Sequence, residues 1–338
     1  MAAFNVAVIG ATGLVGSEVV RRLEGRGFPV KNLVPMASKK SSGTLVEFRG
    51  EGVQVVQASE DGLRGMDLVF LCVGQEEAVR YGYAAKEAGA LVIDKSNAFR
   101  MDPEVPLVVP EVNPKAAFHH KGIVASPNCS TIQLVVAIKP LYDAVGIKRL
   151  IVSTYQSVSG TGKDAVTELR DQTEALLKGE EYRPSAYPYR IAFNLIPHID
   201  AFEDTGYTKE EMKLVRETRK ILEDPGLPIS ATAVRVPVFV GHSEAVTVDT
   251  QKECDVEEAR RLWSEAPGVV LVDAPEALLY PMPVDCEGRD EVFVGRVRRD
   301  ISCERGLTFW VVADNLRKGA ATNAVQIAEL VLLGEVSR

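Results

Sequence analysis

The sequence predicts an α/β protein in which an N-terminal Rossmann-type parallel sheet is followed by a second, α+β domain with a mixed sheet. Over roughly the first 125 residues, short β-branched runs alternate with helical stretches, which is typical of a parallel sheet covered by helices. A glycine-rich turn directly follows the first of these runs. Beyond residue 149, strands follow one another with few regular helices between them, as in mixed or antiparallel sheets.

The first domain is predicted at residues 1–127, and a C-terminal segment at about 314–338 completes it. Hydrophobic periodicity predicts its elements. We expect strands at 5–9, 68–73, 91–94 and 105–109, and helices at 14–25, 75–88 and about 318–333. The last helix is rich in alanine, which suits close packing on the first domain.

The second domain, predicted at residues 128–313, holds the catalytic, substrate-binding and subunit-contact surfaces. We expect strands at 150–156, 231–240, 245–250 and 291–299. Thr208 and Glu211 form a capping box that opens a helix to about residue 222. Residues 182–207 are rich in Pro, Tyr and Phe and too apolar for a free linker, so we expect an ordered excursion at a subunit contact.

Composition excludes several classes of protein. The net charge of −8 argues against nucleic-acid binding, which needs a basic surface. No apolar run approaches the ~20 residues of a membrane span, and the N-terminus lacks the basic start of a signal peptide. The five cysteines are scattered and form no Cys-x-x-Cys pair. We therefore expect no disulfides, no metal site and a cytoplasmic location.

The turn Gly10-Ala11-Thr12-Gly13-Leu14-Val15-Gly16 lies between a strand and a helix. Glycines there let the backbone approach a pyrophosphate, which then meets the helix N-terminus, so this turn predicts a dinucleotide site. The alternative is a tight turn that binds nothing. The candidate cofactor-binding residues in it are Gly10, Thr12, Gly13, Leu14 and Val15.

The end of the second strand distinguishes NADP from NAD. NAD sites usually place an acid there for the ribose diol. Residues 36–43 contain no acid but include Ser38, Lys39, Lys40 and Ser41, and a cationic, hydroxyl-rich loop suits a 2′-phosphate. We therefore expect NADP, with an exposed basic loop as the alternative.

Cys129 follows Pro127 and Asn128 and opens an apolar helical stretch. Asn is a favoured N-cap, so Cys129 is predicted in the first helical turn, where the macrodipole favours a thiolate. A thiolate attacks acyl carbons. The alternative is a buried structural thiol.

Several other segments supply candidate partners for Cys129. Arg235 lies in an apolar run and needs an anion, while His242 is the best acid–base candidate. Their spacing places them on opposite faces of a straight strand, so they share a site only if Pro237 or Gly241 bends the chain. His198 is interpreted as packing, and the pair at residues 119–120 as surface.

The remaining candidates have ordinary alternatives. Gln156 ends a strand before a turn of small residues, and Arg100 follows the carboxyl end of a predicted parallel strand, where α/β sites gather. Most such arginines are solvated. Glu210 and Lys213 share a helix face, and their default interpretation is an exposed ion pair.

Taken together, these segments resemble the aspartate-β-semialdehyde dehydrogenase family over nearly the whole chain. The matching motifs are GATGLVG at 10–16, SNAFR at 96–100, PEVN at 110–113, PNCST at 127–131, QSVSGTG at 156–162, the segment from Arg235 to His242, and DNLRKGAA at 314–321.

The resemblance implies a role for each matching residue. Cys129 is the acyl-forming nucleophile, His242 the proton acceptor and donor, and Gln156 orients the substrate and thioester. Arg235 binds the substrate α-carboxylate and Glu210 its amino end. Arg100 and Lys213 bind the phosphate. Ser159, Gly160 and Asn315 contact the nicotinamide half of NADP.

The implied activity is NADPH-dependent reductive dephosphorylation of L-aspartyl 4-phosphate to L-aspartate 4-semialdehyde by a cytoplasmic homodimer. N-acetyl-γ-glutamyl-phosphate reductase is the nearest rival, but its Pro-Gly-Cys-Tyr-Pro type of turn differs from the one at Cys129. Glyceraldehyde-3-phosphate dehydrogenase is more distant, since its Ser-Cys-Thr-Thr-Asn-Cys run is absent. A noncatalytic NADP-binding thiol sensor is the alternative of another class, and it does not need two anion-binding arginines.

Overall fold

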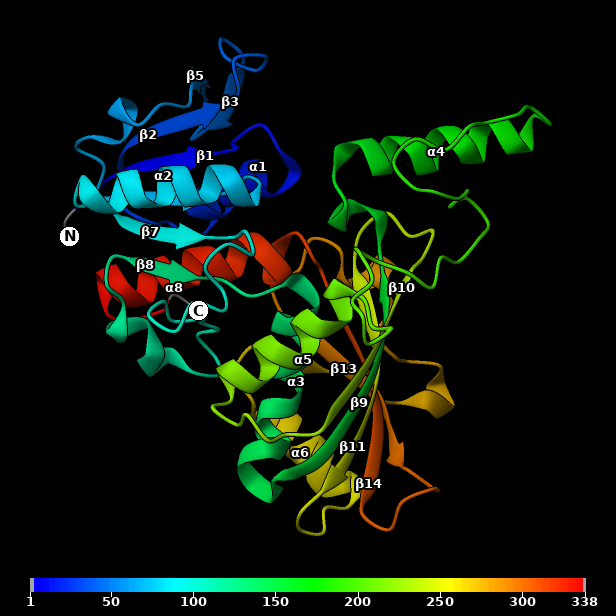
Figure 1. The fold of residues 1–338 in the computed structure, drawn as a ribbon. Helices are drawn as coiled ribbons and strands as arrows, with labels where there is room; N and C mark the ends of the chain where they lie inside the picture. Colours follow the sequence, from blue (N-terminus) through cyan, green and yellow to red (C-terminus); the bar gives the residue numbers. More distant parts are fainter. Residues whose placement is uncertain (1–2, 337–338) are drawn as a thin grey trace. The chain divides into compact units, whose positions relative to one another are not determined.

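The computed structural model describes residues 3–336, which divide into two compact units. The first unit contains the residues up to Asn128 together with those from Ala320, and the second runs from Cys129 to Gly319. Each unit has its own sheet (Figure 1).

Among the described residues, the first unit contains a six-stranded sheet in the order β5-β2-β1-β6-β7-β8, and every neighbouring pair of strands is parallel. The strands are β1 (Phe4–Ile9), β2 (Val30–Ala37), β5 (Val56–Gln57), β6 (Leu68–Leu71), β7 (Leu91–Asp94) and β8 (Ile123–Ala125). A small hairpin, β3 (Leu45–Phe48) and β4 (Glu51–Gln54), lies beside them. The predicted parallel sheet is confirmed.

Helices α1 (Leu14–Gly25), α2 (Gln75–Glu87) and α8 (Thr322–Leu333) belong to this unit. Helix α8 packs into the core of the sheet with residues such as Val6 and Phe70, and Ala324 and Ala328 of the predicted alanine-containing stretch belong to that core. Arg26 fixes it further through two hydrogen bonds of 2.9 and 2.8 Å to the buried Glu329 carboxylate.

Two boundaries in the first unit differ from expectation. The predicted strand at 105–109 is wrong: only Leu107 bridges Ala125, because Pro106 and Pro110 on either side have no N–H to donate to a ladder. The predicted helix at 318–333 begins as a π-helical turn, Arg317–Ala321, before α8.

The second unit contains a mixed sheet in the order β10-β9-β11-β14-β13-β12, six strands among the described residues. They are β9 (Ile147–Gln156), β10 (Ile229–Arg235), β11 (His242–Thr250), β12 (Val269–Leu271), β13 (Val292–Arg299) and β14 (Gly306–Ala313). β9 is parallel to β10 and antiparallel to β11. The predicted mixed sheet is confirmed.

Helices α3 (Cys129–Val145), α5 (Lys209–Ile221) and α6 (Val256–Glu265) lie along one face of this sheet (Figure 1). Trp263 of α6 shows how they pack, because its ring lies 4.7 Å from that of Phe309 and its indole N–H donates to the Ala137 carbonyl oxygen. The opposite face carries half-buried side chains, among them Tyr155 and Trp310.

The sequence reading missed α4 (Lys163–Leu177), α6 and β14, and it extended one strand too far. The predicted strand at 231–240 ends at Arg235 because Pro237 follows. The capping box of α5 is confirmed in both directions, Thr208 to the Glu211 N–H and Glu211 to the Thr208 N–H.

Candidate functional site

Three strand ends of the second unit meet at one edge of the sheet. The carboxyl ends of β9 and β10 place Gln156 beside Arg235 in the parallel register. β11 runs the opposite way, so its first residue, His242, lies at the same edge. Arg235 and His242 therefore share a site because the chain turns at Gly241 (φ 93°), one of the two bends expected, and this turn places them on different strands.

Cys129 is the first residue of α3, as predicted. Its side chain is half-buried, which contradicts the alternative of an enclosed structural thiol. Cys254 and Cys286 fit that alternative instead, since burial raises their thiol pKa to about 11 and about 12.

Ser157 fixes the imidazole of His242. The Ser157 N–H donates to Nδ1 at 3.0 Å, and its Oγ lies 3.1 Å from the same nitrogen. Because a backbone N–H only donates, Nδ1 is the acceptor, and the hydrogen of the neutral ring is on Nε2. Burial and the nearby Arg235 charge lower the pKa of His242 to about 3, so the ring is neutral at physiological pH.

The Nε2 atom of His242 has no hydrogen-bond partner among the described residues, although it is buried. Gly160 lies against it: a Cβ on Gly160 would be 3.2 Å from Nε2 and 3.3 Å from Arg235 Nη1. Only a glycine leaves this space open. Gly160 therefore lies against both His242 and Arg235, in addition to its expected place beside the nicotinamide.

Arg235 is buried and held by protein on one side only. Its Nη1 donates to the Ser157 carbonyl oxygen at 2.6 Å, and its guanidinium lies 5.9 Å from the centre of the Tyr187 ring. Its Nε has no partner within the described residues. A buried guanidinium with an unused donor suits a carboxylate ligand.

Glu210 and Lys213 are not the exposed ion pair of the default interpretation. Glu210 is 4% exposed, accepts from Gln156 Nε2 at 3.1 Å and lies 2.9 Å from Lys213 Nζ. Asp200 binds the same ammonium at 2.9 Å. Burial alone would lower the pKa of Lys213, but the two carboxylates outweigh it and raise that pKa.

Asn315 binds the protein loop around this edge. Its Oδ1 accepts from Ser157 Oγ, Ser159 Oγ and the Gly241 N–H at 3.0, 3.3 and 2.9 Å. Its amide nitrogen donates to Ser159 Oγ. These contacts give Asn315 and Ser159 a structural part in positioning the loop that carries Ser157.

The glycine loop of the first unit has the geometry of a dinucleotide turn. Gly10 has φ 85°, and a Cβ there would lie 2.3 Å from the Cys72 carbonyl oxygen. A Cβ on Gly16 would lie 2.1 Å from the Gly10 carbonyl oxygen. Gly13 is the N-cap of α1 and leaves the first turn without a side-chain cap or an acid. The loop therefore fits a pyrophosphate.

The neighbouring residues also fit a cofactor. Lys39 and Lys40 are exposed after β2, and among the described residues neither forms an ion pair, which suits a 2′-phosphate. A hollow of about 900 Å³ lies against the N-terminus of α2 at residues 74–79, after β6.

Arg100 also lies in the first unit. It is 7% exposed, and it donates to the carbonyl oxygens of Ser126 and Lys95. It is thus a buried, oriented guanidinium and not a solvated one.

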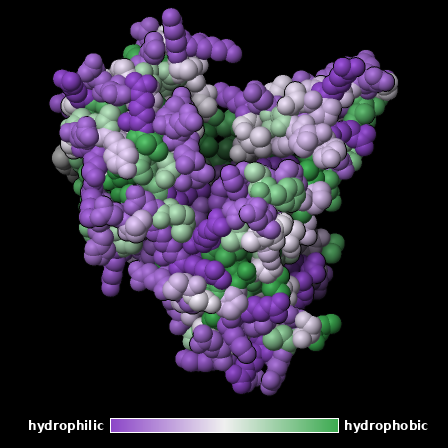
Figure 2. All heavy atoms as spheres, in the orientation of Figure 1, coloured by the Kyte–Doolittle hydropathy of each residue, from purple (hydrophilic) through white to green (hydrophobic). Residues whose placement is uncertain are grey.

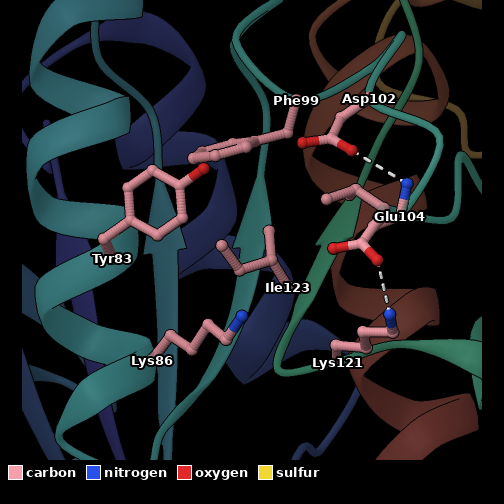
Figure 3. Close-up of a pocket in the computed structure, with 8 residues that line it drawn as sticks. Tyr83, Lys86, Phe99, Asp102, Glu104, Lys121 and Ile123 are labelled. Atoms are coloured by element: carbon pink, nitrogen blue, oxygen red, sulfur yellow. Dashed lines mark hydrogen bonds and ion pairs between the residues drawn. The ribbon is translucent and has the colours of Figure 1, made fainter.

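A separate small pocket of about 60 Å³ in the first unit contains none of the predicted residues (Figure 3). Tyr83 and Phe99 meet edge to face at its rim, with ring centres 5.5 Å apart, and Lys121 pairs with Glu104. This volume holds a few water molecules and no substrate of the expected size.

Sequence reasoning missed Ser157, Tyr187 and Asp200. Ser157 acts mainly through its backbone N–H, which leaves no signal in the sequence. Tyr187 and Asp200 lie in the excursion at 182–207, which has no periodicity to place them. Of the two other histidine assignments, His198 packs as expected, stacked on Phe202 at 4.6 Å. The surface assignment holds for exposed His119 but not for His120, which is half-buried and accepts from the Gly122 N–H at 3.0 Å.

Both units match known domain families. Residues 5–120 match the family described as semialdehyde dehydrogenase, NAD binding domain, and residues 138–318 match semialdehyde dehydrogenase, dimerisation domain. Fold and site thus define a dehydrogenase of the semialdehyde class with an NAD(P)-binding domain.

Full-length relatives narrow the class. The aspartate-semialdehyde dehydrogenase of Aquifex aeolicus is 52% identical over 97% of this chain and 98% of its own length, and that of Bacillus subtilis is 48% identical over 96% of each. The crystal structure of aspartate semialdehyde dehydrogenase II from Vibrio cholerae, complexed with ASA, has a TM-score of 0.96 at 48% identity and covers 98% of this chain and 99% of that one. The chain belongs to the aspartate-semialdehyde dehydrogenase family.

None of the helices within residues 3–336 has the length and apolar character needed to cross a membrane. The same residues contain no group of three or more His, Cys, Asp or Glu side chains arranged to hold a metal ion.

Proposed function

We propose that this chain converts L-aspartyl 4-phosphate to L-aspartate 4-semialdehyde with NADPH, a step in the biosynthesis of lysine, methionine, threonine and isoleucine. The observation that carries this proposal is the sheet edge where Gln156, Arg235 and a tautomer-fixed His242 meet, in the unit that also contains half-buried Cys129 at a helix start.

The substrate has an α-carboxylate, an α-ammonium and an acyl phosphate, and the site offers a partner to each. Arg235 has an unused donor for the carboxylate, and Glu210 is a buried carboxylate for the ammonium. Gln156, bound to Glu210, orients the acyl group between them. Arg100 and Lys213 hold the phosphate; Lys213 must then share its ammonium with Asp200 and Glu210.

The chemistry follows from a thiolate that is both nucleophile and leaving group. The sulfur of Cys129 bonds to the acyl carbon while the bond from that carbon to the phosphate oxygen breaks, and phosphate leaves with the electron pair. Bound NADPH supplies the hydride that reduces the thioester carbon. The resulting oxyanion expels the Cys129 thiolate and releases the aldehyde.

His242 assists at the acyl oxygen. Its neutral Nε2–H donates a hydrogen bond to the oxyanion, which stabilises charge where it develops. The proton acceptance at Nε2 expected from the resemblance would need the other tautomer, with the hydrogen at Nδ1, and the Ser157 N–H that donates to Nδ1 opposes that tautomer. Which of the two roles His242 takes therefore depends on Ser157.

The residues for the dinucleotide are Gly10, Thr12, Gly13, Leu14 and Val15 at the pyrophosphate, and Ser38, Lys40 and Ser41 at the 2′-phosphate. Ser159, Gly160 and Asn315 serve the nicotinamide half. The loop at 38–41, which has no acid, supports NADP over NAD.

A second copy of the chain completes the proposed homodimer. Apolar groups reach the surface of the second unit (Figure 2), and in the excursion Tyr189, Phe193, Leu195 and Phe202 are 65, 63, 57 and 62% exposed. The match to a dimerisation domain and the half-buried sheet face support burial of these surfaces against another subunit. Sedimentation of the purified chain tests the dimer.

The decisive assay measures NADP reduction with phosphate and either aspartate semialdehyde or N-acetylglutamate semialdehyde. We expect turnover with the first only, and weaker activity with NAD. Cys129→Ser should bind NADP normally and lose almost all turnover, because a serine alkoxide is a poor leaving group. Near-normal turnover of this variant refutes the covalent route, and NADP binding without turnover in the unmodified protein favours the thiol sensor.

A further inference from the structure

A buried carboxyl group, Glu244, lies directly behind the site and has no part in the chemistry above. It is 0% exposed, and neither of its oxygens has a hydrogen-bond partner among the described residues. It lies two residues after His242 on β11, so both side chains are on the same face of the sheet. An unpaired carboxylate in such a place is strongly destabilising.

Within residues 3–336, burial and Gln133 are the two influences that act on the Glu244 carboxyl, and neither is a cation. Thr154 of β9 and Val311 of β14 are its register partners, and Gln133 approaches from α3. His242, on its own strand, is neutral. The cations of the elements packed against Glu244 are engaged or exposed elsewhere: Lys139 of α3 pairs with Asp143, and Lys148 and Arg149 are exposed at the start of β9. On α5, Lys213 is bound to Glu210 and Asp200.

Gln133 connects this carboxyl to both reacting elements. It lies one helical turn after Cys129, on the same face of α3. Its Nε2 donates to the main-chain oxygen of His242 at 3.3 Å, while its buried Oε1 has no donor within the described residues. An acceptor without a donor beside a carboxyl group is satisfied only if the carboxyl carries a proton.

We propose that Glu244 is a positioning residue that is held as a neutral carboxylic acid, donates its proton to Gln133 Oε1, and so keeps the Gln133 amide on the carbonyl of His242. The second N–H of the same amide then meets the other Glu244 oxygen, and every polar atom of the pair is satisfied. The pair joins the helix that begins at Cys129 to the strand that begins at His242.

Protonation agrees with the electrostatics of the site. Burial raises the pKa of Glu244 well above the ordinary range of a carboxyl, and it outweighs the opposing effect of the hydrogen bond that the Gln133 amide can offer to the ionised group. Glu168, another buried acid of this unit, has the opposite environment: its Oε2 accepts from the N–H groups of Ser185 and Ala186 and from the Ser185 hydroxyl.

The inference rests on the proposed function and is tested by steady-state kinetics of Glu244→Gln, Glu244→Leu, Gln133→Leu and the double variant Gln133→Leu/Glu244→Leu. An amide at 244 also donates to Gln133 Oε1, so Glu244→Gln should stay within about twofold of the unmodified kcat. Each single leucine variant, Glu244→Leu or Gln133→Leu, should lower kcat by about ten- to a hundredfold with KM nearly constant, because the Gln133 amide no longer holds His242 in place. The double variant should be no slower than the slower single variant.

Val246→Ala is the matched control, since Val246 is the next residue on the same buried face. It should lose stability but keep kcat. Histidine ¹⁵N spectra should show Nε2–H in the unmodified protein and in Glu244→Gln, and a mixed tautomer in Gln133→Leu.

Three results overturn the inference: unmodified turnover in both leucine variants, a loss in Glu244→Gln equal to that in Glu244→Leu, or additive losses in the double variant. If Glu244→Leu does not fold, Gln133→Leu and Glu244→Gln decide the question by the same criteria. None of these results affects the proposed function, which fails only if the unmodified enzyme lacks turnover or Cys129→Ser retains it.

Discussion

Replacing Gly319 by alanine tests how closely the chain packs against the nucleophile. Gly319 lies in the π-helical turn Arg317–Ala321, where its N–H donates to the Asp314 carbonyl oxygen at 3.1 Å. A Cβ at this position would be 2.9 Å from Cys129 Cβ and 3.3 Å from Cys129 Cα. These atoms belong to the start of α3 and are not the flexible end of a long side chain.

The size of the effect follows from that distance. Ordinary carbon–carbon contacts begin at about 3.5 Å, so the two segments must separate by roughly 0.6 Å or more. A displacement of about 1 Å in a catalytic group can reduce a rate about a hundredfold, and we expect kcat to fall about tenfold or more. Alanine is favoured over glycine in a helix by about 1 kcal/mol, but overpacking costs about 1–3 kcal/mol, so the net change should be a loss of about 0–2 kcal/mol.

The assay combines kcat with the rate at which iodoacetamide alkylates Cys129, located by peptide mass spectrometry. Gly226→Ala is the matched control, because its new Cβ would find its nearest neighbour, Asp224 Oδ1, at 3.8 Å. We expect the control to keep both rates. If Gly319→Ala turns over and is alkylated like the unmodified protein, the close packing of this turn on Cys129 does not position the nucleophile.

Three further predictions concern the sheet edge. Gly160→Ala should lower kcat by roughly tenfold while the melting temperature changes little, because its Cβ would be 3.2 Å from the Nε2 atom of His242. Tyr187→Leu should raise the KM for aspartate semialdehyde several-fold, and Tyr187→Phe much less, since the ring face lies on the Arg235 guanidinium. Because the folded pKa of His242 is lowered to about 3, the unfolded chain binds more protons between about pH 6.5 and 3. The free energy of unfolding should therefore decrease as the pH is lowered from about 6.5 to 3, and it should decrease less steeply in His242→Asn. Equal dependence on pH in the two proteins, measured by denaturant titration at each pH, contradicts this.

The N-terminal unit could be predicted from sequence because its signals are local. The glycines at 10, 13 and 16, a strand before them and a helix after them lie within one short stretch. Where local rules competed, the prediction failed: residues 105–109 are apolar enough for a strand, but Pro106 within them and Pro110 after them prevent a ladder. β14 was missed although it lies near the middle of its sheet, since nothing local distinguishes it from the strands around it.

The site was harder to predict because strand order is not a local property. The spacing of Arg235 and His242 requires the chain to bend at Pro237 or Gly241, and it does: β10 ends before Pro237 and the chain turns at Gly241. The sequence does not show that the two residues then flank β9 from different strands. Only the family resemblance brought them together with Gln156. Glu244 did leave a signal: it is in phase with Val246 and Val248, so an acid occupies a position that the alternation assigns to the core.

The charge balance of this unit gives a reason for a neutral Glu244. Arg235 and Lys213 contribute two positive charges, which Glu210 and Asp200 balance, and His242 adds none. The substrate carries more negative than positive charge at neutral pH because of its phosphate. An ionised Glu244 behind His242 would add a repulsive charge in a region of low dielectric, where it is felt most strongly. A carboxylic acid paired with Gln133 supplies the same hydrogen bonds without that charge, so the site can accept an anionic acyl phosphate and stabilise an oxyanion at His242 Nε2.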